Sequence, residues 1–258
     1  MITSDQNSKI KLVRALLGRS KERRESGAFV IEGVRLVEEA VHSHWGIQFA
    51  LYDDTLNERG KLLVESLKSG GVEVNVISES LMNSLSETET PQGILAVIEL
   101  NQLPITNYPN FILILDQIRD PGNLGTLLRT AAAAGVQAIL VSPETTDAFA
   151  PKVLRSGMGA HFRLPIHSMT WEEIEQMTKS AGLQIFLADM DGQSCWETDL
   201  RQPLALIIGG EAEGAREEAR KLATQKISIP MVGNVESLNA GVAGSVMMFE
   251  VVRQRLNM

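Results

Sequence analysis

The sequence predicts an α/β protein with a mostly parallel sheet in its larger C-terminal part and a small α/β unit before it. Strand-like and helix-like segments alternate along the chain, which is typical of this class. Strand candidates in the second half are apolar throughout, for example residues 204–208, as expected for parallel strands covered on both faces. Residues 100–110 hold two prolines and three asparagines, which predicts a linker. We therefore divide the chain into residues 1–100, a linker at 101–110, and residues 111–258.

In the first part, apolar residues at helical spacing from Ile10 to Leu17 predict a helix that Gly18 ends. A basic stretch and a short apolar run follow, and Gly33 precedes a second helical pattern from Val34 to Val41. Alternating segments complete this unit: strands are expected at 47–52, 72–77 and 94–98, and helices at 57–69 and 79–85.

The second part repeats the alternation with longer apolar runs. Strands are expected at residues 111–115, 138–141, 184–188, 204–208 and 226–229. Helices are expected at 125–134, 151–158, 171–181, 215–224 and 239–256. The chain shows no internal repeat and no low-complexity segment.

Composition narrows the class of protein. The chain has 258 residues, 44% hydrophobic and 22% charged, which is the balance of a globular protein. Its one cysteine, Cys195, excludes an internal disulfide and fits a reducing compartment. The polar N-terminus does not resemble a signal peptide, and no apolar run approaches the roughly 20 residues that span a bilayer. We expect a cytoplasmic protein with no membrane partner.

Charge gives two opposing indications about nucleic acid. The formal net charge of −8 argues against such a partner. However, basic residues crowd residues 9–24, which contain a single acid, Glu22. Such an arm can bind phosphates with salt-dependent affinity, or it can be a solvated helix face. As RNA-binding candidates we take four of these residues: Arg19, Lys21, Arg23 and Arg24.

The most informative stretch begins where the strand at 111–115 ends. Asp120-Pro121-Gly122-Asn123 forms a turn, and a helix then opens that carries Arg129. An asparagine and an arginine at the mouth of a sheet are groups that a ribose or phosphate site needs. Residues 208–214 and 229–239 repeat the arrangement of strand, glycine-containing loop and helix. In a parallel sheet all three loops lie at the carboxyl edge, where ligands bind.

The glycine-rich loop after residue 208 contains Gly209, Gly210 and Glu211. It is neither a dinucleotide fingerprint nor a Walker loop. Its acids would repel phosphates, so it suits the hydroxyls, amine and sulfonium of S-adenosylmethionine, or else it is an ordinary turn before a helix with an acidic start. Similarly, Ser237 and Asn239 either line a site or simply cap the following helix.

Other chemistries find no support. The four histidines have no metal-ligand spacing, so we expect no metal. Cys195 has no evident base beside it, and a hydrolase elbow of the Gly-x-Ser-x-Gly type is missing from the sequence.

Together these motifs resemble the SpoU, or TrmH-like, family of SPOUT RNA methyltransferases. The resemblance covers the whole second part, and the first part is similar to the family's N-terminal substrate-binding domain. Its motifs, in chain order, are Asp120-Pro121-Gly122-Asn123-Leu124-Gly125 through Arg129, residues 155–162, residues 208–214, and Ile229-Pro230-Met231 with Ser237-Leu238-Asn239.

The resemblance implies a SPOUT fold with a deep trefoil knot, an exception to the rule against threaded chains. It implies a homodimer that binds S-adenosylmethionine and methylates a ribose 2′-hydroxyl in structured RNA. By position, the cofactor contacts would be Gly209, Ile229 and Leu238, with Asp189 as a weaker candidate.

The same resemblance implies the catalytic set. Arginine is a poor general base, so we expect Arg129 to bind the adjacent phosphate and orient the ribose. Asn123 would bond to the ribose or hold Arg129, and Glu211 would orient a polar neighbour. Ser237 and Asn239 would line the cofactor and hydroxyl pocket. One departure stands out: the family often has Val-Ser after the last asparagine, where this chain has Ala240-Gly241.

The substrate stays open at this point. We expect ribosomal RNA, with transfer RNA as the second choice. The alternatives are a non-catalytic RNA-binding or assembly protein on the same fold, and a nucleotide-binding α/β enzyme of ordinary topology, which would lack a phosphate fingerprint here.

Overall fold

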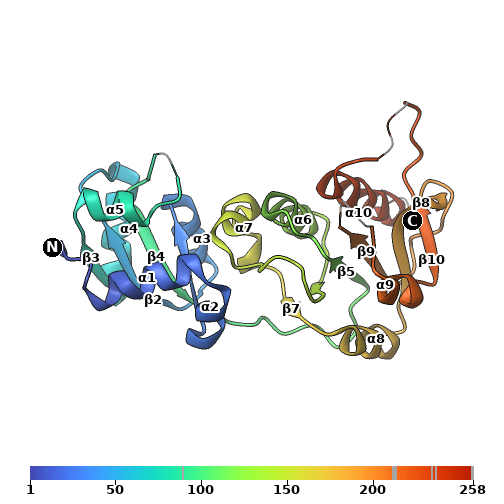
Figure 1. Ribbon diagram of the computed structural model, residues 1–258, viewed down its shortest axis with the longest axis horizontal. Coiled ribbons are helices and arrows are strands. Elements are labelled where there is room, and N and C mark those ends of the chain that lie inside the picture. Colours follow the sequence, from blue (N-terminus) through green and yellow to red (C-terminus); the bar gives the residue numbers. More distant parts are fainter. Residues whose placement is uncertain (89, 211–213, 234, 236, 257–258) are drawn as a thin grey trace. The chain divides into compact units, whose positions relative to one another are not determined.

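The computed structural model describes residues 1–88, 90–210, 214–233, 235 and 237–256. The chain forms two compact units, and Figure 1 labels most of their elements. The first comprises Met1–Asn101 and Phe149–Phe162, and the second comprises Gln102–Ala148 and Arg163–Met258. The boundary near residue 101 coincides with the start of the predicted linker. The segment 149–162 is grouped with the first unit, whereas the predicted division placed it in the second.

The first unit is built on a four-stranded sheet with the order β1-β4-β2-β3. Strand β4 is antiparallel to β1 and β2, and β2 is parallel to β3. Its elements are α1 (Ser8–Gly18), α2 (Ser20–Ser26), β1 (Ala28–Glu32), α3 (Val34–His42), β2 (Ile47–Tyr52), α4 (Glu58–Ser69), β3 (Glu73–Val76), α5 (Glu79–Leu85), β4 (Ile94–Glu99), α7 (Pro151–Gly157) and the 3-10 turn η1 (Ala160–Phe162).

One face of this sheet packs against α1 and α5, which contribute side chains such as Ile10 and Met82 to a buried core. The segment 149–162 also packs against β1. The rings of Phe29 and Phe149 lie 5.0 Å apart, and Trp45 donates from Nε1 to the Phe162 carbonyl at 3.3 Å. These contacts explain why a segment so late in the sequence belongs to this unit.

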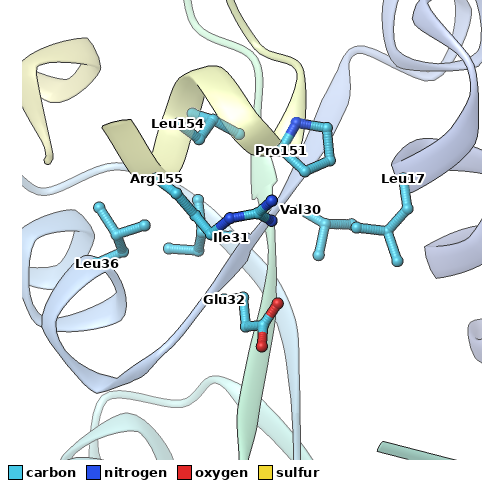
Figure 2. Close-up of a pocket in the computed structure, with 8 residues that line it drawn as sticks. All are labelled: Leu17, Val30, Ile31, Glu32, Leu36, Pro151, Leu154 and Arg155. Carbon is cyan, nitrogen blue, oxygen red and sulfur yellow. The ribbon is translucent and has the colours of Figure 1, made fainter. Parts of the chain in front are cut away.

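Figure 2 shows a pocket where α7 meets β1 within the first unit. Apolar side chains of the strand and of α7 form half of its lining. The lining residues are Leu17, Val30, Ile31, Glu32, Leu36, Pro151, Leu154 and Arg155.

The second unit has a six-stranded, fully parallel sheet with the order β10-β8-β9-β5-β6-β7. Its elements are β5 (Phe111–Asp116), α6 (Pro121–Ala133), β6 (Ala138–Val141), β7 (Ile166–Ser168), α8 (Trp171–Ser180), β8 (Gln184–Ser194), β9 (Leu204–Gly209), α9 (Glu217–Leu222), β10 (Gln225–Ser228) and α10 (Ala240–Leu256).

Both faces of this sheet are covered, as the apolar strands predict. Helices α8 and α9 close one face, where Ile174 and Ala219 join a core with alternate strand residues. Helices α6 and α10 close the other face, where a side chain at Gly244 would meet both Leu127 of α6 and Ile208 of β9.

The structure differs from the predicted elements in several places, including strand β7, which was not predicted. Helix α6 begins at Pro121 because the Asp120 side chain accepts a hydrogen bond from the Asn123 N–H at 2.8 Å and caps it. Strand β8 continues to Ser194, with a shift of register against β10. The basic stretch forms a helix, α2, that the apolar pattern did not indicate. Within the described residues, no helix is both long and apolar enough to cross a membrane.

Candidate active site

Two of the predicted cofactor contacts, Gly209 and Ile229, lie at one edge of the sheet in the second unit. Strand β9 ends at Gly209, and Ile229 directly follows β10. Strand β8 separates these two strands in the sheet, and all three run parallel. Gly209 and Ile229 therefore both lie at the carboxyl edge, where parallel α/β sheets bind ligands.

A hydrogen bond joins the first and third sequence motifs at this edge. Asn239 donates from Nδ2 to the Oδ1 of Asn123 at 2.9 Å. The Oδ1 of Asn239 accepts from the Val242 N–H at 3.2 Å and so caps the start of α10. The Asn239 side chain therefore caps α10 and at the same time contacts Asn123 of the first motif, while its role in lining a site stays a prediction.

Helices α6 and α10 also approach each other closely at positions after Asn123 and Asn239. Thr130 and Ser245 share a hydrogen bond of 2.9 Å between their hydroxyls. A Cβ at Gly244 would lie 2.4 Å from a methyl carbon of Leu127, and a Cβ at Gly241 would lie 3.3 Å from the Asn123 Oδ1. The glycine that departs from the family pattern therefore leaves space beside the Asn123–Asn239 pair.

Arg129 lies on the exposed surface of α6. Arg129 comes six positions after Asn123 in the helix. It therefore lies about 9 Å further along the helix axis and on a different face. Among the described residues, its guanidinium has no hydrogen-bond or ion-pair partner. A fixed positive charge is thus presented to solvent on the helix that carries Asn123.

The glycine-rich loop after β9 needs its glycines for close chain packing. A Cβ at Gly209 would lie 2.7 Å from the Ala215 nitrogen, and one at Gly210 would lie 2.6 Å from the Gln117 carbonyl oxygen. Real Cβ atoms do not approach backbone so closely, so glycine is required at both positions. Glu211, the predicted orienting acid, lies outside the described residues.

The edge residues have properties that suit S-adenosylmethionine. Gly209 and Ile229 are partly exposed, and Ser237 and Leu238 are exposed just before α10. They combine accessible backbone groups, a hydroxyl and two apolar side chains, which is what an adenosine and a methionine tail require. These residues would hold the cofactor.

Asp189 has strong partners within the protein. Arg220 donates to its Oδ2 at 2.8 Å, and the Lys226 ammonium lies 3.0 Å from the same oxygen. Burial raises the pKa of the Asp189 carboxyl, but the bonds from Lys226 and the Asp191 N–H, with both cationic charges, outweigh it and hold the pKa below its usual value. The carboxylate therefore fixes the middle of β8 against α9 and β10, so any contact with a cofactor would be additional.

The basic arm of the first unit divides into two kinds of residue. Arg19, Lys21 and Arg24 are exposed on or beside α2, and the first two form long ion pairs of 3.7 and 3.6 Å with acids of the same helix. Arg23 is only 5% exposed, and its Nη1 donates to the carbonyls of Leu16 and Leu17 at the end of α1. The RNA-binding role predicted for Arg23 is therefore corrected to a structural one.

Sequence reasoning missed Asp116, the last residue of β5. Its carboxylate is fully buried and accepts from the Ser142 hydroxyl at 2.9 Å and from the Arg216 N–H at 2.7 Å. The signal was present in the sequence, because an acid that ends a continuous apolar strand must find partners when it is buried.

The remaining candidates for chemistry are inert. Cys195 is buried, and burial with the nearby Glu250 charge raises the pKa of its thiol to about 11. Across the part of the chain that the structure describes, no three His, Cys, Asp or Glu side chains gather in a way that could hold a metal ion.

Comparison with known proteins decides the family. The sequence model of the SpoU rRNA methylase family matches residues 110–249, and that of an MRM3-like substrate binding domain matches residues 7–96. The chain belongs to the SpoU rRNA methylase family. Its predicted family, α/β fold class and cofactor are thereby confirmed, and its class is that of an RNA methyltransferase.

Relatives of this SpoU protein share its whole length. It is 32% identical to the 23S rRNA (guanosine(2553)-2′-O)-methyltransferase of Bacillus subtilis, over 97% of this chain and 98% of the relative. It is 33% identical to the 23S rRNA (uridine(2479)-2′-O)-methyltransferase of Streptomyces viridochromogenes, over 99% and 93%. The crystal structure of an S-adenosylmethionine-bound rRNA methyltransferase from Sinorhizobium meliloti matches with a TM-score of 0.87 at 30% identity, over 98% and 97%.

Proposed function

We propose that this SpoU protein transfers a methyl group from S-adenosylmethionine to a ribose 2′-hydroxyl of ribosomal RNA. The observation that carries the proposal is the Asn123–Asn239 hydrogen bond of 2.9 Å, which joins two family motifs at the carboxyl edge of the sheet. Family membership and the names of the full-length relatives agree with this reaction and substrate.

The reaction needs an oriented hydroxyl more than a strong base. S-adenosylmethionine supplies an electrophilic methyl group on its sulfonium. Arg129 binds the phosphate next to the target ribose and holds the 2′-oxygen in line, since a guanidinium offers N–H donors and no acceptor. Phosphate or water then takes the proton of the hydroxyl. The exposed position of Arg129, with no partner among the described residues, leaves it available to RNA.

The Asn123–Asn239 pair fixes the position of the helix that would bind RNA relative to the segment that would bind the cofactor. Asn123 is on the helix of Arg129, and Asn239 follows Leu238 in the cofactor segment. The hydrogen bond between their amides ties these two segments together. Ser237 and the backbone of Gly209 complete the lining of the pocket.

Ribosomal RNA is preferred over transfer RNA for two reasons. The chain has a substrate-binding unit before the methyltransferase unit, and full-length relatives with both units are named for 23S rRNA. Those relatives modify a guanosine in one case and a uridine in the other, so the base is left open. The basic surface of Arg19, Lys21 and Arg24 would bind RNA phosphates.

We also propose that the protein acts as a homodimer with a trefoil-knotted cofactor domain. Helix α10 exposes Val242 by 48%, Phe249 by 49% and Leu256 by 79%. These residues recur every seven positions and form one apolar stripe that suits a second copy of the helix. Gly209 and Gly210 pack directly against backbone atoms of other segments, and this supports the proposed knot because chain segments that cross each other must approach closely. Sedimentation of wild type and Phe249→Glu tests the dimer, which the variant should weaken.

A second candidate is an RNA-binding protein without turnover on the same fold. Parallel incubations with ribosomal RNA, transfer RNA and methyl-labelled S-adenosylmethionine separate the possibilities. We expect label on ribosomal RNA with wild type, and none with Arg129→Ala, which keeps its affinity for the cofactor. Label confined to transfer RNA would change the substrate, and RNA binding without label would favour the non-catalytic reading.

A further inference from the structure

Asp116 joins three loops at the carboxyl edge of the second sheet. It ends β5, so it directly precedes the turn that leads to Asn123. Its Oδ1 accepts from Ser142, just after β6, and its Oδ2 accepts from the backbone N–H of Arg216, just before α9. A buried carboxylate with two such bonds fixes the relative positions of the segments that donate to it.

The glycine-rich loop also contacts the residue after Asp116 through its first part. Gly210 packs against the carbonyl of Gln117, the residue after Asp116, at a distance that excludes a Cβ. Gln117 itself has a φ of 54°, an uncommon backbone conformation for a residue other than glycine. Gly210 also forms an isolated antiparallel bridge with Gly214. Gly210 and Arg216 thus both contact the Asp116–Gln117 segment, one through the Gln117 carbonyl and the other through the Asp116 carboxylate.

Side chains around the junction reinforce it. The Arg216 guanidinium forms an ion pair with Glu144, and Arg119 lies 3.7 Å from the same carboxylate. The Thr145 hydroxyl donates to the Leu115 carbonyl at 3.2 Å. These contacts hold the loop after β6 beside the loop that enters α9, so the hydrogen bond from Arg216 to Asp116 is made in a prearranged position.

We propose that Asp116 is a positioning residue for cofactor binding. Its bond to the Arg216 N–H fixes residues 214–216, which pack against Gly209, and so sets where the Gly209 backbone faces the cofactor. The proposal rests on the proposed use of this edge for S-adenosylmethionine. It assigns Asp116 no contact with either substrate.

Two substitutions of Asp116 separate hydrogen bonding from bulk folding. In Asp116→Asn, the amide oxygen can still accept from Arg216, and the amide nitrogen can donate to Ser142, because a hydroxyl also accepts. Asp116→Ala loses both bonds. Ser142→Ala removes only one and leaves the bond to Arg216. Gly210→Ala displaces the loop by a different route, and Gly18→Ala, which meets nothing within 4 Å, is the matched control.

The measurements are cofactor affinity by calorimetry, RNA affinity, and hydrogen exchange of peptides from 209–222 without cofactor. We expect Asp116→Ala and Gly210→Ala to weaken S-adenosylmethionine binding by about tenfold or more and to speed exchange, with RNA affinity within about twofold of wild type. Asp116→Asn, Ser142→Ala and Gly18→Ala should stay near wild type in all three.

Unchanged cofactor affinity and exchange in Asp116→Ala would overturn the proposal, as would an Asn variant as weak as the Ala variant. If Asp116→Ala does not fold, Asp116→Asn still tests the proposal, because about tenfold weaker cofactor binding in that variant, which keeps both hydrogen bonds, would overturn it. Should wild type bind S-adenosylmethionine without methylating any RNA, the proposed function fails, while cofactor affinity and exchange still test the role of Asp116.

Discussion

The side-chain amide of Asn239 donates to the Oδ1 of Asn123, which lies 116 residues earlier in the chain. The bond connects the first turns of α6 and α10, the two helices that cover one face of the methyltransferase sheet. Since Asn239 also caps α10, one side chain both stabilises a helix and holds Asn123. The two roles can be separated by choosing the substitution.

Asn239→Ser keeps a capping hydroxyl but is too short to reach Asn123, whereas Asn239→Ala loses both functions. We expect the serine variant to melt close to wild type and the alanine variant to lose about 1 kcal/mol of stability. Both should lose most of their methyl transfer. A serine variant with full turnover would show that the bond between the asparagines is dispensable.

Arg23 and Arg24 are adjacent in the sequence, but we expect substitution of the first to change stability and substitution of the second to change RNA binding. Arg23→Met should lower the free energy of unfolding by about 1 to 3 kcal/mol, because the last carbonyls of α1 lose a charged, buried donor. Arg24→Met should leave the melting temperature unchanged but weaken RNA binding and reduce its salt slope by about one. Thermal melting and a salt titration of RNA affinity measure both. Equal salt slopes for wild type and Arg24→Met would remove Arg24 from the RNA-facing surface.

Glu250 on α10 gives a pH-dependent contribution to stability. The hydrogen bond from Arg253 lowers the pKa of its carboxyl; burial opposes this, and the bond from Gln254 and the Arg253 charge add to the lowering. A lowered folded-state pKa means that the stabilisation is complete above the unfolded value of about 4.3 and is lost as pH falls through the folded pKa.

Glu250→Gln should therefore cost about 1 to 3 kcal/mol at pH 7 and progressively less below pH 4. Melting temperatures of wild type and variant between pH 7 and pH 3 measure this difference. Glu217→Gln, which breaks an exposed pair with Lys221, is the control and should show no measurable loss. A gap between wild type and Glu250→Gln that stays constant with pH would contradict the assignment.

Much of the fold could be predicted because its signals are local. The continuous apolar runs of β5 and β9 place both strands to within one residue, and the spacing of Gly209 and Asn239 from Asn123 indicated the site. Helix α6 begins earlier than its apolar pattern because a cap, not hydrophobicity, sets its start.

The features that sequence could not supply depend on tertiary contacts. Arg23 looks like its neighbours in sequence, yet only packing reveals that its guanidinium faces the end of α1. The segment 149–162 carries a motif of the methyltransferase family but packs through Phe149 and Phe162 in the first unit. The partners of Asp116 come from loops after β6 and before α9, which no local pattern connects.

The most direct test of the proposed ribose methylation is the chemical position of the transferred methyl group. Ribosomal RNA labelled by the protein with methyl-labelled S-adenosylmethionine is hydrolysed in alkali, which spares only linkages next to a 2′-O-methyl ribose. If the protein methylates a ribose 2′-hydroxyl, the label is recovered in alkali-resistant dinucleotides from one site. Label released as mononucleotides, with the methyl group on a base, would contradict it.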